Sequence, residues 1–211
     1  MIFDLDGVLV DSERLAVRVE AEVLDRLGWP IGEAGVIARF LGRSQRHMHT
    51  EVERELGHPI DWDATFGTAH REAFDAELAP IEGVPEVLAA LAAADVTVCV
   101  ASSSTREAIA DKLGRTGLAG AFGDRVFSVE DVPREKPAPD VFLRAAATLG
   151  VVPRHCAVVE DSLSGVAAGL SAGMAVYAYD GGLVGREQLA GPDVTVFDEM
   201  SRLPALLGVV A

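Results

Sequence analysis

The sequence of 211 residues predicts an α/β fold, in which a parallel sheet core is flanked by helices and a helical domain is inserted after the first strand. Two observations predict this fold. Short β-rich runs alternate with helical patterns over most of the chain, whereas residues 12–79 contain helical patterns alone. Such alternation is typical of a Rossmann-like sheet, whose ligands bind at the carboxyl ends of the strands.

The elements follow one another in a regular order after an opening strand that ends at Asp4. Further strands are expected at 96–101, 125–129, 156–160, 175–179 and 194–197, and helices between them at 84–94, 105–114, 139–150 and 164–172. Residues 1–11 and 80–211 would then form the core domain. Residues 12–79 would form the inserted domain, with helices at 14–27, 44–56 and 62–78.

The inserted segment is too long to be an ordinary crossover packed on the sheet, which is the alternative. Its two ends, near Ser12 and residues 80–83, would lie close together and could act as hinges.

Composition limits the classes of partner. A net charge of -15 argues against nucleic acid, because phosphate backbones need a basic footprint. No run is long enough to span a bilayer and no signal peptide is expected, so we expect a cytoplasmic protein without a membrane partner. Cys99 and Cys156 lie in apolar runs and are expected to be buried free thiols. The sequence leaves the oligomeric state open.

Two carboxylates, Asp4 and Asp6, mark the end of the first strand and precede Gly7. Carboxylates crowded at the mouth of an apolar strand repel each other unless a cation or a shared proton offsets the charge. A hard divalent ion such as Mg²⁺ is the simplest answer. The alternative is a simple turn, since Asp-Gly is a common turn pair.

Polar residues also follow the second and third strands. Ser102 begins a hydroxyl-rich turn into a helix, where free backbone amides could bind an anion. Ser104 and Glu107 have the spacing of a capping box, so we assign Ser104 to capping and Ser102 to phosphate contact. Lys136 precedes a proline-stiffened turn, although an isolated lysine is more often a solvated surface charge.

A second carboxylate pair, Glu160 and Asp161, follows the fourth strand. Helix capping is the alternative, because Asp161 or Ser162 could begin the next helix. Four carboxylates, a hydroxyl and a lysine at matching strand ends nevertheless indicate a site for a cation and a phosphate group.

The ordered motifs resemble those of the haloacid dehalogenase superfamily of phosphohydrolases. They are residues 4–8, Ser102, Lys136 with Pro137, residues 160–162, Gly165 and residues 172–174. The resemblance covers essentially the whole chain, and residues 12–79 resemble the superfamily's small helical cap.

The resemblance implies a catalytic role for each motif. Asp4 would attack phosphorus to form an aspartyl-phosphate, while Asp6 would protonate the leaving oxygen and later activate water. Ser102 and Lys136 would hold the phosphoryl oxygens. The magnesium ligands would be Asp4, the backbone carbonyl of Asp6, Asp161 and Glu160, the last directly or through water.

The resemblance also suggests where the substrate is selected. Arg43 and Gln45 lie where such caps present a substrate loop, in a stretch that also holds Arg46, His47 and His49. We expect these two residues to contact a small sugar phosphate or phosphorylated sugar acid.

Three alternatives can be weighed from the residues. A true haloacid dehalogenase lacks the second aspartate, so Asp6 favours phosphate chemistry. A β-phosphoglucomutase-type mutase carries a cap-hinge histidine where this chain has residues 15–17, Leu-Ala-Val, and a cap arginine where it has Gln45. A catalytically silent phosphate-binding protein stays open because fold alone does not establish function. The sequence therefore favours a phosphatase.

Overall fold

The computed structural model describes the chain except residues 42–44 and 210–211. The chain divides into two compact units, Met1–Asp11 with Ala79–Ala211, and Ser12–Leu78. The expected insertion, 12–79, extends one residue beyond this second unit. The two units are described separately below.

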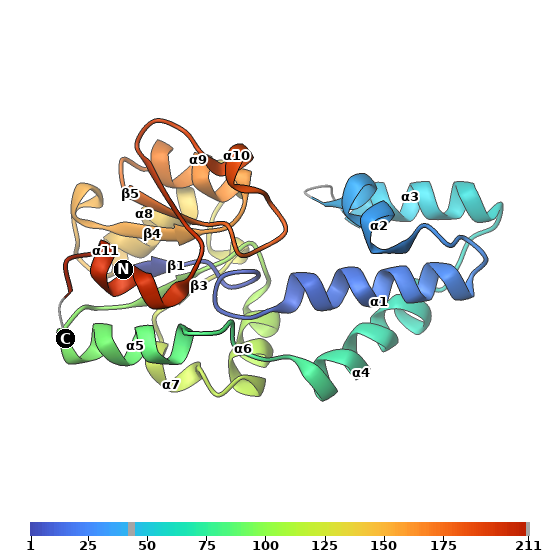
Figure 1. Cartoon of the computed structure of the whole chain (residues 1–211), viewed down its shortest axis with the longest axis horizontal. Helices are drawn as coiled ribbons and strands as arrows, with labels where there is room; N and C mark the ends of the chain where they lie inside the picture. The colour runs from blue at the N-terminus through green and yellow to red at the C-terminus, as the bar shows by residue number, and fades with distance from the viewer. Residues whose placement is uncertain (42–44, 210–211) are drawn as a thin grey trace. The chain divides into compact units, whose positions relative to one another are not determined.

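The first unit is built on a parallel sheet, shown in Figure 1. Within the described residues the sheet has six strands in the order β3-β2-β1-β4-β5-β6. Their bounds are β1 Ile2–Phe3, β2 Cys99–Ala101, β3 Val126–Phe127, β4 Ala157–Glu160, β5 Ala175–Tyr179 and β6 Val194–Phe197. Ile2 of β1 lies opposite Cys99 on one side and Val158 on the other, so β1 is central. The predicted Rossmann-like α/β fold is confirmed.

Helices connect the strands of this unit. They are α5 Val84–Ala93, α6 Arg106–Arg115, α7 Ala119–Phe122, α8 Asp140–Thr148, α9 Leu163–Ser171, α10 Arg186–Leu189 and α11 Leu203–Leu206, with 3₁₀ turns at Val129–Asp131, Pro153–His155 and Met200–Arg202. Helix α8 packs against β2 and β3, α9 packs against β4 and β5, and the two helices contact each other. The sequence did not predict α7, α10 and α11, because four residues are too few to show a helical period.

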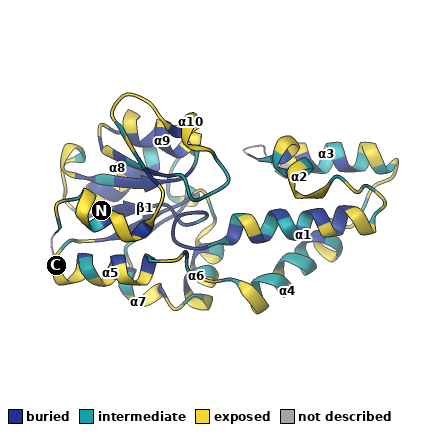
Figure 2. Ribbon diagram, viewed as in Figure 1, coloured by how far each residue is buried: buried dark blue, intermediate teal, exposed yellow. Residues whose placement is uncertain are grey.

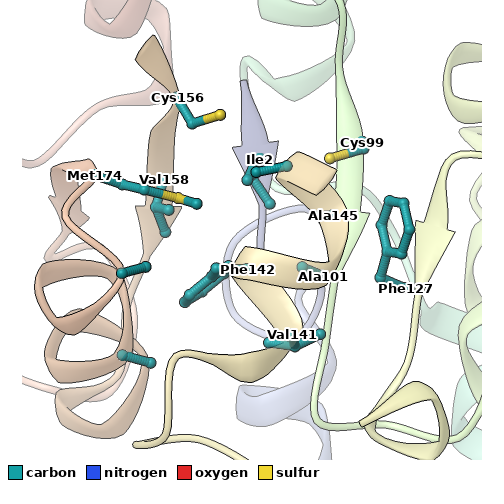
Figure 3. Close-up of a cluster of buried hydrophobic side chains, with 13 residues drawn as sticks. Ile2, Cys99, Ala101, Phe127, Val141, Phe142, Ala145, Cys156, Val158 and Met174 are labelled. Carbon is teal, nitrogen blue, oxygen red and sulfur yellow. The ribbon is translucent and has the colours of Figure 1, made fainter. Parts of the chain in front are cut away.

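A hydrophobic cluster joins α8 to the central strands (Figure 3). Val141, Phe142 and Ala145 of α8 face the sheet, where Ile2 and Val158 are almost fully buried. Burial is greatest in the central strands β1 and β2, whose residues are all buried, and is lower in the outer strand β6 (Figure 2). This packing holds the carboxyl ends of neighbouring strands in one register.

Both cysteines are buried free thiols, as the sequence predicted. Burial raises the pKa of Cys99 to about 12, so this thiol stays protonated at physiological pH.

The two chain segments that lead into and out of the second unit run side by side. Ile81 N donates to Leu9 O at 3.0 Å, and Asp11 N donates to Ala79 O at 3.1 Å. The ends of the insertion therefore lie together, as expected. Movement about them stays a prediction.

The second unit is helical. Its elements are α1 Ser12–Arg26, α2 Gly32–Phe40, α3 Gln45–Leu56, a π-helical turn at Asp63–Gly67, and α4 Thr68–Glu77. Helix α1 packs against α2 and α4. The sequence did not predict α2, in which Gly32 and Gly35 weaken the helical signal. No helix in the described part of the chain has both the length and the apolar character to cross a bilayer.

We predict that replacing Phe142 with alanine destabilises the protein by about 3–5 kcal/mol, because the ring is fully buried and leaves a cavity. The matched control is Leu143→Ala on the same helix, where the side chain is 38% exposed and the loss should stay near 0.5 kcal/mol. Urea denaturation measures both values. Similar losses for the two variants would contradict the proposed core.

Candidate active site

The sequence-predicted polar residues of the first unit gather at the carboxyl ends of three neighbouring strands. Asp4 follows β1, Ser102 follows β2, and Glu160 ends β4 with Asp161 directly after it. Parallel neighbours end at the same edge of a sheet, so their terminal side chains meet there. Lys136 reaches this edge from the loop before α8.

Lys136 links the ends of the three strands. Its Nζ donates to Asp4 Oδ1 at 2.5 Å, to Glu160 Oε1 at 2.6 Å and to the backbone carbonyl of Ala101 at 3.0 Å. The side chain is only 3% exposed, and Nζ lies 4.9 Å from the centre of the Phe142 ring. An ammonium group has three donors, so this structure satisfies every one of them. The peptide bond between Lys136 and Pro137 is cis.

Glu160 is fully buried and accepts hydrogen bonds on both oxygens. Besides Lys136, the donors are Ser162 Oγ at 2.9 Å and the backbone N–H groups of Asp161 and Ser162, each at 3.2 Å, all to Oε2. Ser162 is also the N-cap of α9, because its Oγ accepts from Gly165 N at 3.0 Å. Glu160 thus fixes both the ammonium of Lys136 and the start of the loop that carries Asp161.

The electrostatics of this cluster are set by burial. Burial raises the pKa of Asp4 to about 8 despite the lowering effect of Lys136, with further raising contributions from Glu160 and Asp6. Burial alone would lower the pKa of Lys136, but Asp4 and Glu160 outweigh it and raise that pKa above its usual value. The ammonium therefore stays charged, while the ionised form of Asp4 is disfavoured unless a further positive charge lies nearby.

Three of these carboxylates have the arrangement of a metal site. Ligand oxygens of Asp4, Glu160 and Asp161 all lie within 4.8 Å of one another, and all three residues are buried. Two glycines leave room for the Asp161 carboxylate. A Cβ on Gly7, whose φ is +78°, would lie 2.0 Å from Asp161 Oδ2, and a Cβ on Gly182 would lie 2.8 Å from the same atom. An all-oxygen donor set of this kind fits a hard divalent cation.

Asp6 lies beside this cluster and is held by α6 and the turn before it. Ser104 Oγ donates to Asp6 Oδ2 at 2.8 Å, and Lys112 Nζ forms an ion pair with Asp6 Oδ1. The capping role that the sequence suggested for Ser104 is wrong. The N-cap of α6 is Thr105, whose Oγ1 accepts from Ala108 N at 3.3 Å. Because the next residue, Thr105, caps the helix, the Ser104 hydroxyl can donate to Asp6 instead.

Ser102 lies next to this turn and is 1% exposed. Its Oγ accepts from Ser104 N at 3.0 Å, which leaves the hydroxyl proton available for a donated hydrogen bond.

Sequence reasoning missed Lys112. The available signal was its place on α6 between Ile109 and Leu113, both buried, because residues three and four apart share a helix face. A lysine on an apolar helix face needs a partner for its charge, and Asp6 supplies one.

The substrate residues expected in the inserted unit cannot be placed in the same way. Arg43 lies outside the described residues, and Gln45 begins α3 but its side chain is also outside the description. Both remain predictions.

Comparisons with known proteins place this geometry in a family. Residues 1–179 match the family model described as haloacid dehalogenase-like hydrolase. The 6-phosphogluconate phosphatase of Escherichia coli (strain K12) is 30% identical over 209 residues, covering 98% of this chain and 93% of that protein. Hexitol phosphatase B of the same strain is 31% identical over 185 residues, covering 82% of this chain and 79% of that protein.

A solved structure is similar over nearly the whole chain. It is a haloacid dehalogenase family hydrolase from Deinococcus radiodurans R1 with bound phosphate and sodium. Its TM-score is 0.85 at 31% identity, and the match covers 98% of this chain and 93% of that one.

We predict that Gly165→Ala destabilises the protein by about 1–3 kcal/mol, because the new Cβ would lie 1.8 Å from the Glu160 carboxyl carbon and force it to move. The control is Gly114→Ala in α6, where a Cβ meets nothing within 4 Å. That change should stabilise the protein by about 0.5–1 kcal/mol. Urea denaturation compares the two, and equal effects would mean that Gly165 is not required for the fit around Glu160.

Proposed function

Because the chain belongs to the haloacid dehalogenase-like hydrolase family, we propose that it hydrolyses a small phosphate monoester with Mg²⁺ through an aspartyl-phosphate on Asp4. At the coarser level of a phosphoric monoester hydrolase, the sequence-based prediction is confirmed by the family match and the phosphatase relatives. The metal, the intermediate and the ester belong to the proposal.

The observation that carries the proposal is the convergence of Asp4, Lys136 and Asp161 at the ends of β1 and β4. Asp4 offers one carboxylate oxygen as nucleophile, while Lys136 Nζ donates to the other oxygen, Oδ1, at 2.5 Å. The proposed metal ligands are Asp4, Asp161 and the backbone carbonyl of Asp6. Bound there, Mg²⁺ would offset negative charge on the phosphoryl oxygens and on the carboxylates.

The resemblance implied that Glu160 binds the metal directly or through water, and the proposal favours the second of these. The two oxygens of Glu160 already accept four hydrogen bonds, so this residue is better suited to orient Lys136 and Asp161 than to bind the metal directly. Contact with the cation through water is compatible with this arrangement.

The remaining groups supply phosphate binding and proton transfer. Ser102 can donate its hydroxyl proton to a phosphoryl oxygen, and Lys136 supplies positive charge beside it. As Asp4 forms its bond to phosphorus, the leaving oxygen takes a proton from Asp6. Water then loses a proton to Asp6 and attacks phosphorus, which releases phosphate and restores both aspartates.

The proposed substrates are sugar phosphates and phosphorylated sugar acids. The 6-phosphogluconate and hexitol phosphatases among the relatives support this class. Arg43 and Gln45 of the inserted unit are proposed to contact the part of the substrate beyond the phosphate group. Arginine suits a carboxylate such as that of a sugar acid, because its guanidinium binds carboxylates in a bidentate manner.

The proposal predicts that the protein releases phosphate from such esters with Mg²⁺, and that both a chelator and Asp4→Asn abolish release. Asn has the size of Asp but no nucleophilic carboxylate. The test measures phosphate release from a panel of sugar phosphates and phosphorylated sugar acids. The control, Asp124→Asn, makes the same change at an exposed residue and should keep full activity.

Three other results would change the proposed function. Transfer of phosphate within one sugar without release, followed by ³¹P NMR, would replace the phosphatase with the mutase. Binding of phosphate esters without turnover would indicate a silent binding protein. Activity retained in Asp4→Asn would overturn the proposed nucleophile.

A separate prediction concerns the metal. Asp161→Asn should raise the Mg²⁺ concentration that gives half-maximal activity by at least about tenfold, because it removes one negatively charged oxygen ligand. Titration of activity with Mg²⁺ measures this, and Asp124→Asn is again the control. An unchanged Mg²⁺ requirement would exclude Asp161 from the metal site.

A further inference from the structure

The two lysines of this chain lie opposite the two aspartates of its first motif. The sequence contains sixteen arginines but only Lys112 and Lys136 as lysines. Lys136 is paired with Asp4 and Lys112 with Asp6. Lys136 belongs to the motifs that carry the family resemblance, whereas Lys112 lies outside them.

The pair between Lys112 and Asp6 is largely shielded from water, with side-chain exposures of 14% and 21%. Shielded ion pairs contribute little net stability, because the cost of desolvating two charges offsets their attraction. Helix α6 could have buried an apolar residue at this position, next to Ile109 and Leu113. The lysine therefore needs a reason other than stability.

The contacts to Asp6 fix its carboxylate from two sides. Lys112 binds Oδ1, and the hydroxyl of Ser104 binds Oδ2 at 2.8 Å. Ser104 is itself fixed, because its backbone N–H donates to Ser102 Oγ at 3.0 Å. A donor on each of the two oxygens restricts rotation of the carboxylate and so fixes its plane.

We propose that Lys112 and Ser104 are positioning residues that hold the Asp6 carboxylate in the orientation from which it exchanges protons with the leaving oxygen and with water. The proposal rests on the proposed function, because it requires Asp6 to act as acid and base there. Neither residue needs to contact the substrate. Their effect passes through the geometry of Asp6, since proton transfer requires hydrogen-bond distance and alignment.

The test compares two esters that differ in their need for an acid. An alkyl ester such as 6-phosphogluconate has a poor leaving group that must be protonated, whereas p-nitrophenyl phosphate leaves as a stable anion. The ratio kcat/KM covers the steps through departure of the leaving group. Misplacement of Asp6 should therefore lower kcat/KM for the alkyl ester selectively.

We expect Lys112→Met to lower kcat/KM for the alkyl ester by about 10–100-fold, a part of what general acid catalysis usually contributes. The loss for p-nitrophenyl phosphate should stay within about threefold. Ser104→Ala should show the same selectivity with a smaller loss. Lys112→Arg keeps the positive charge but competes with Ser104 for Asp6, so it should recover only part of the activity. The control is Arg115→Met, which breaks an ion pair with Asp111 on the same helix and should leave both esters unaffected.

A double-mutant cycle with Asp6→Asn tests whether Lys112 acts through Asp6. If it does, Lys112→Met should cost less than about twofold further in the Asp6→Asn background, because residues that act as a unit are not additive. Thermal denaturation of each variant separates loss of fold from loss of positioning, and Ser104→Ala removes a single hydroxyl without changing charge.

Several outcomes would overturn the proposal. Equal losses on both esters would mean that Lys112 acts on the phosphoryl group directly. Additive losses in the cycle would mean that it acts independently of Asp6, and activity at or above the normal level would mean that the pair holds Asp6 away from the reaction. Failure of the proposed function is distinct, because the unmodified protein would then release no phosphate from either ester.

Discussion

The ammonium of Lys136 is the contact on which the rest of this structure depends. It joins Asp4 after β1, the carbonyl of Ala101 at the end of β2 and Glu160 at the end of β4, all within 3.0 Å. Burying a charge is costly unless every donor finds an acceptor. The three strands must therefore end in register around one atom, and the α8 cluster beneath them maintains that register. Sheet packing and site geometry thus depend on each other.

The same contact leaves a charge imbalance. Lys136 offsets one of the carboxylates around it, while Asp4, Glu160 and Asp161 crowd a buried volume. Burial therefore raises the pKa of Asp4 to about 8, although a carboxylate must be ionised to attack phosphorus. A divalent cation at these oxygens would favour the ionised form and at the same time attract a phosphate group. Metal binding, ionisation of the Asp4 nucleophile and attraction of the substrate's negative charge therefore depend on one another.

Local patterns in the sequence were enough to predict the sheet and the strand-end acids. Residues 157–160 form an apolar run that ends in Glu160, and such a run with a carboxylate at its end identifies both a buried strand and a reactive edge. The distinction between Ser104 and Thr105 was beyond local reasoning, because adjacent hydroxyls have the same capping chemistry. The partner of Ser104 is Asp6, 98 residues away, and only the fold brings the two together.

Long-range pairing also explains why helix α2 and Lys112 were missed. Helix α2, Gly32–Phe40, contains two glycines, so packing against α1 rather than helical propensity accounts for its formation. Lys112 was marked by its place on the apolar face of α6, but the sequence between it and Asp6 contains no sign of their contact. Secondary structure and motif position could be predicted, whereas side-chain partners across the sheet could not.

The choice of lysine at both paired positions follows from geometry. A guanidinium is a planar fork that matches one carboxylate in a bidentate manner, whereas an ammonium is a compact charge with three separate donors. At Lys136 the three acceptors come from three different strands, which a fork cannot reach together. At Lys112 a fork would take both oxygens of Asp6 and displace Ser104. An ammonium binds one oxygen and leaves the other to Ser104, so that two separate donors hold the carboxylate that is proposed to carry the proton.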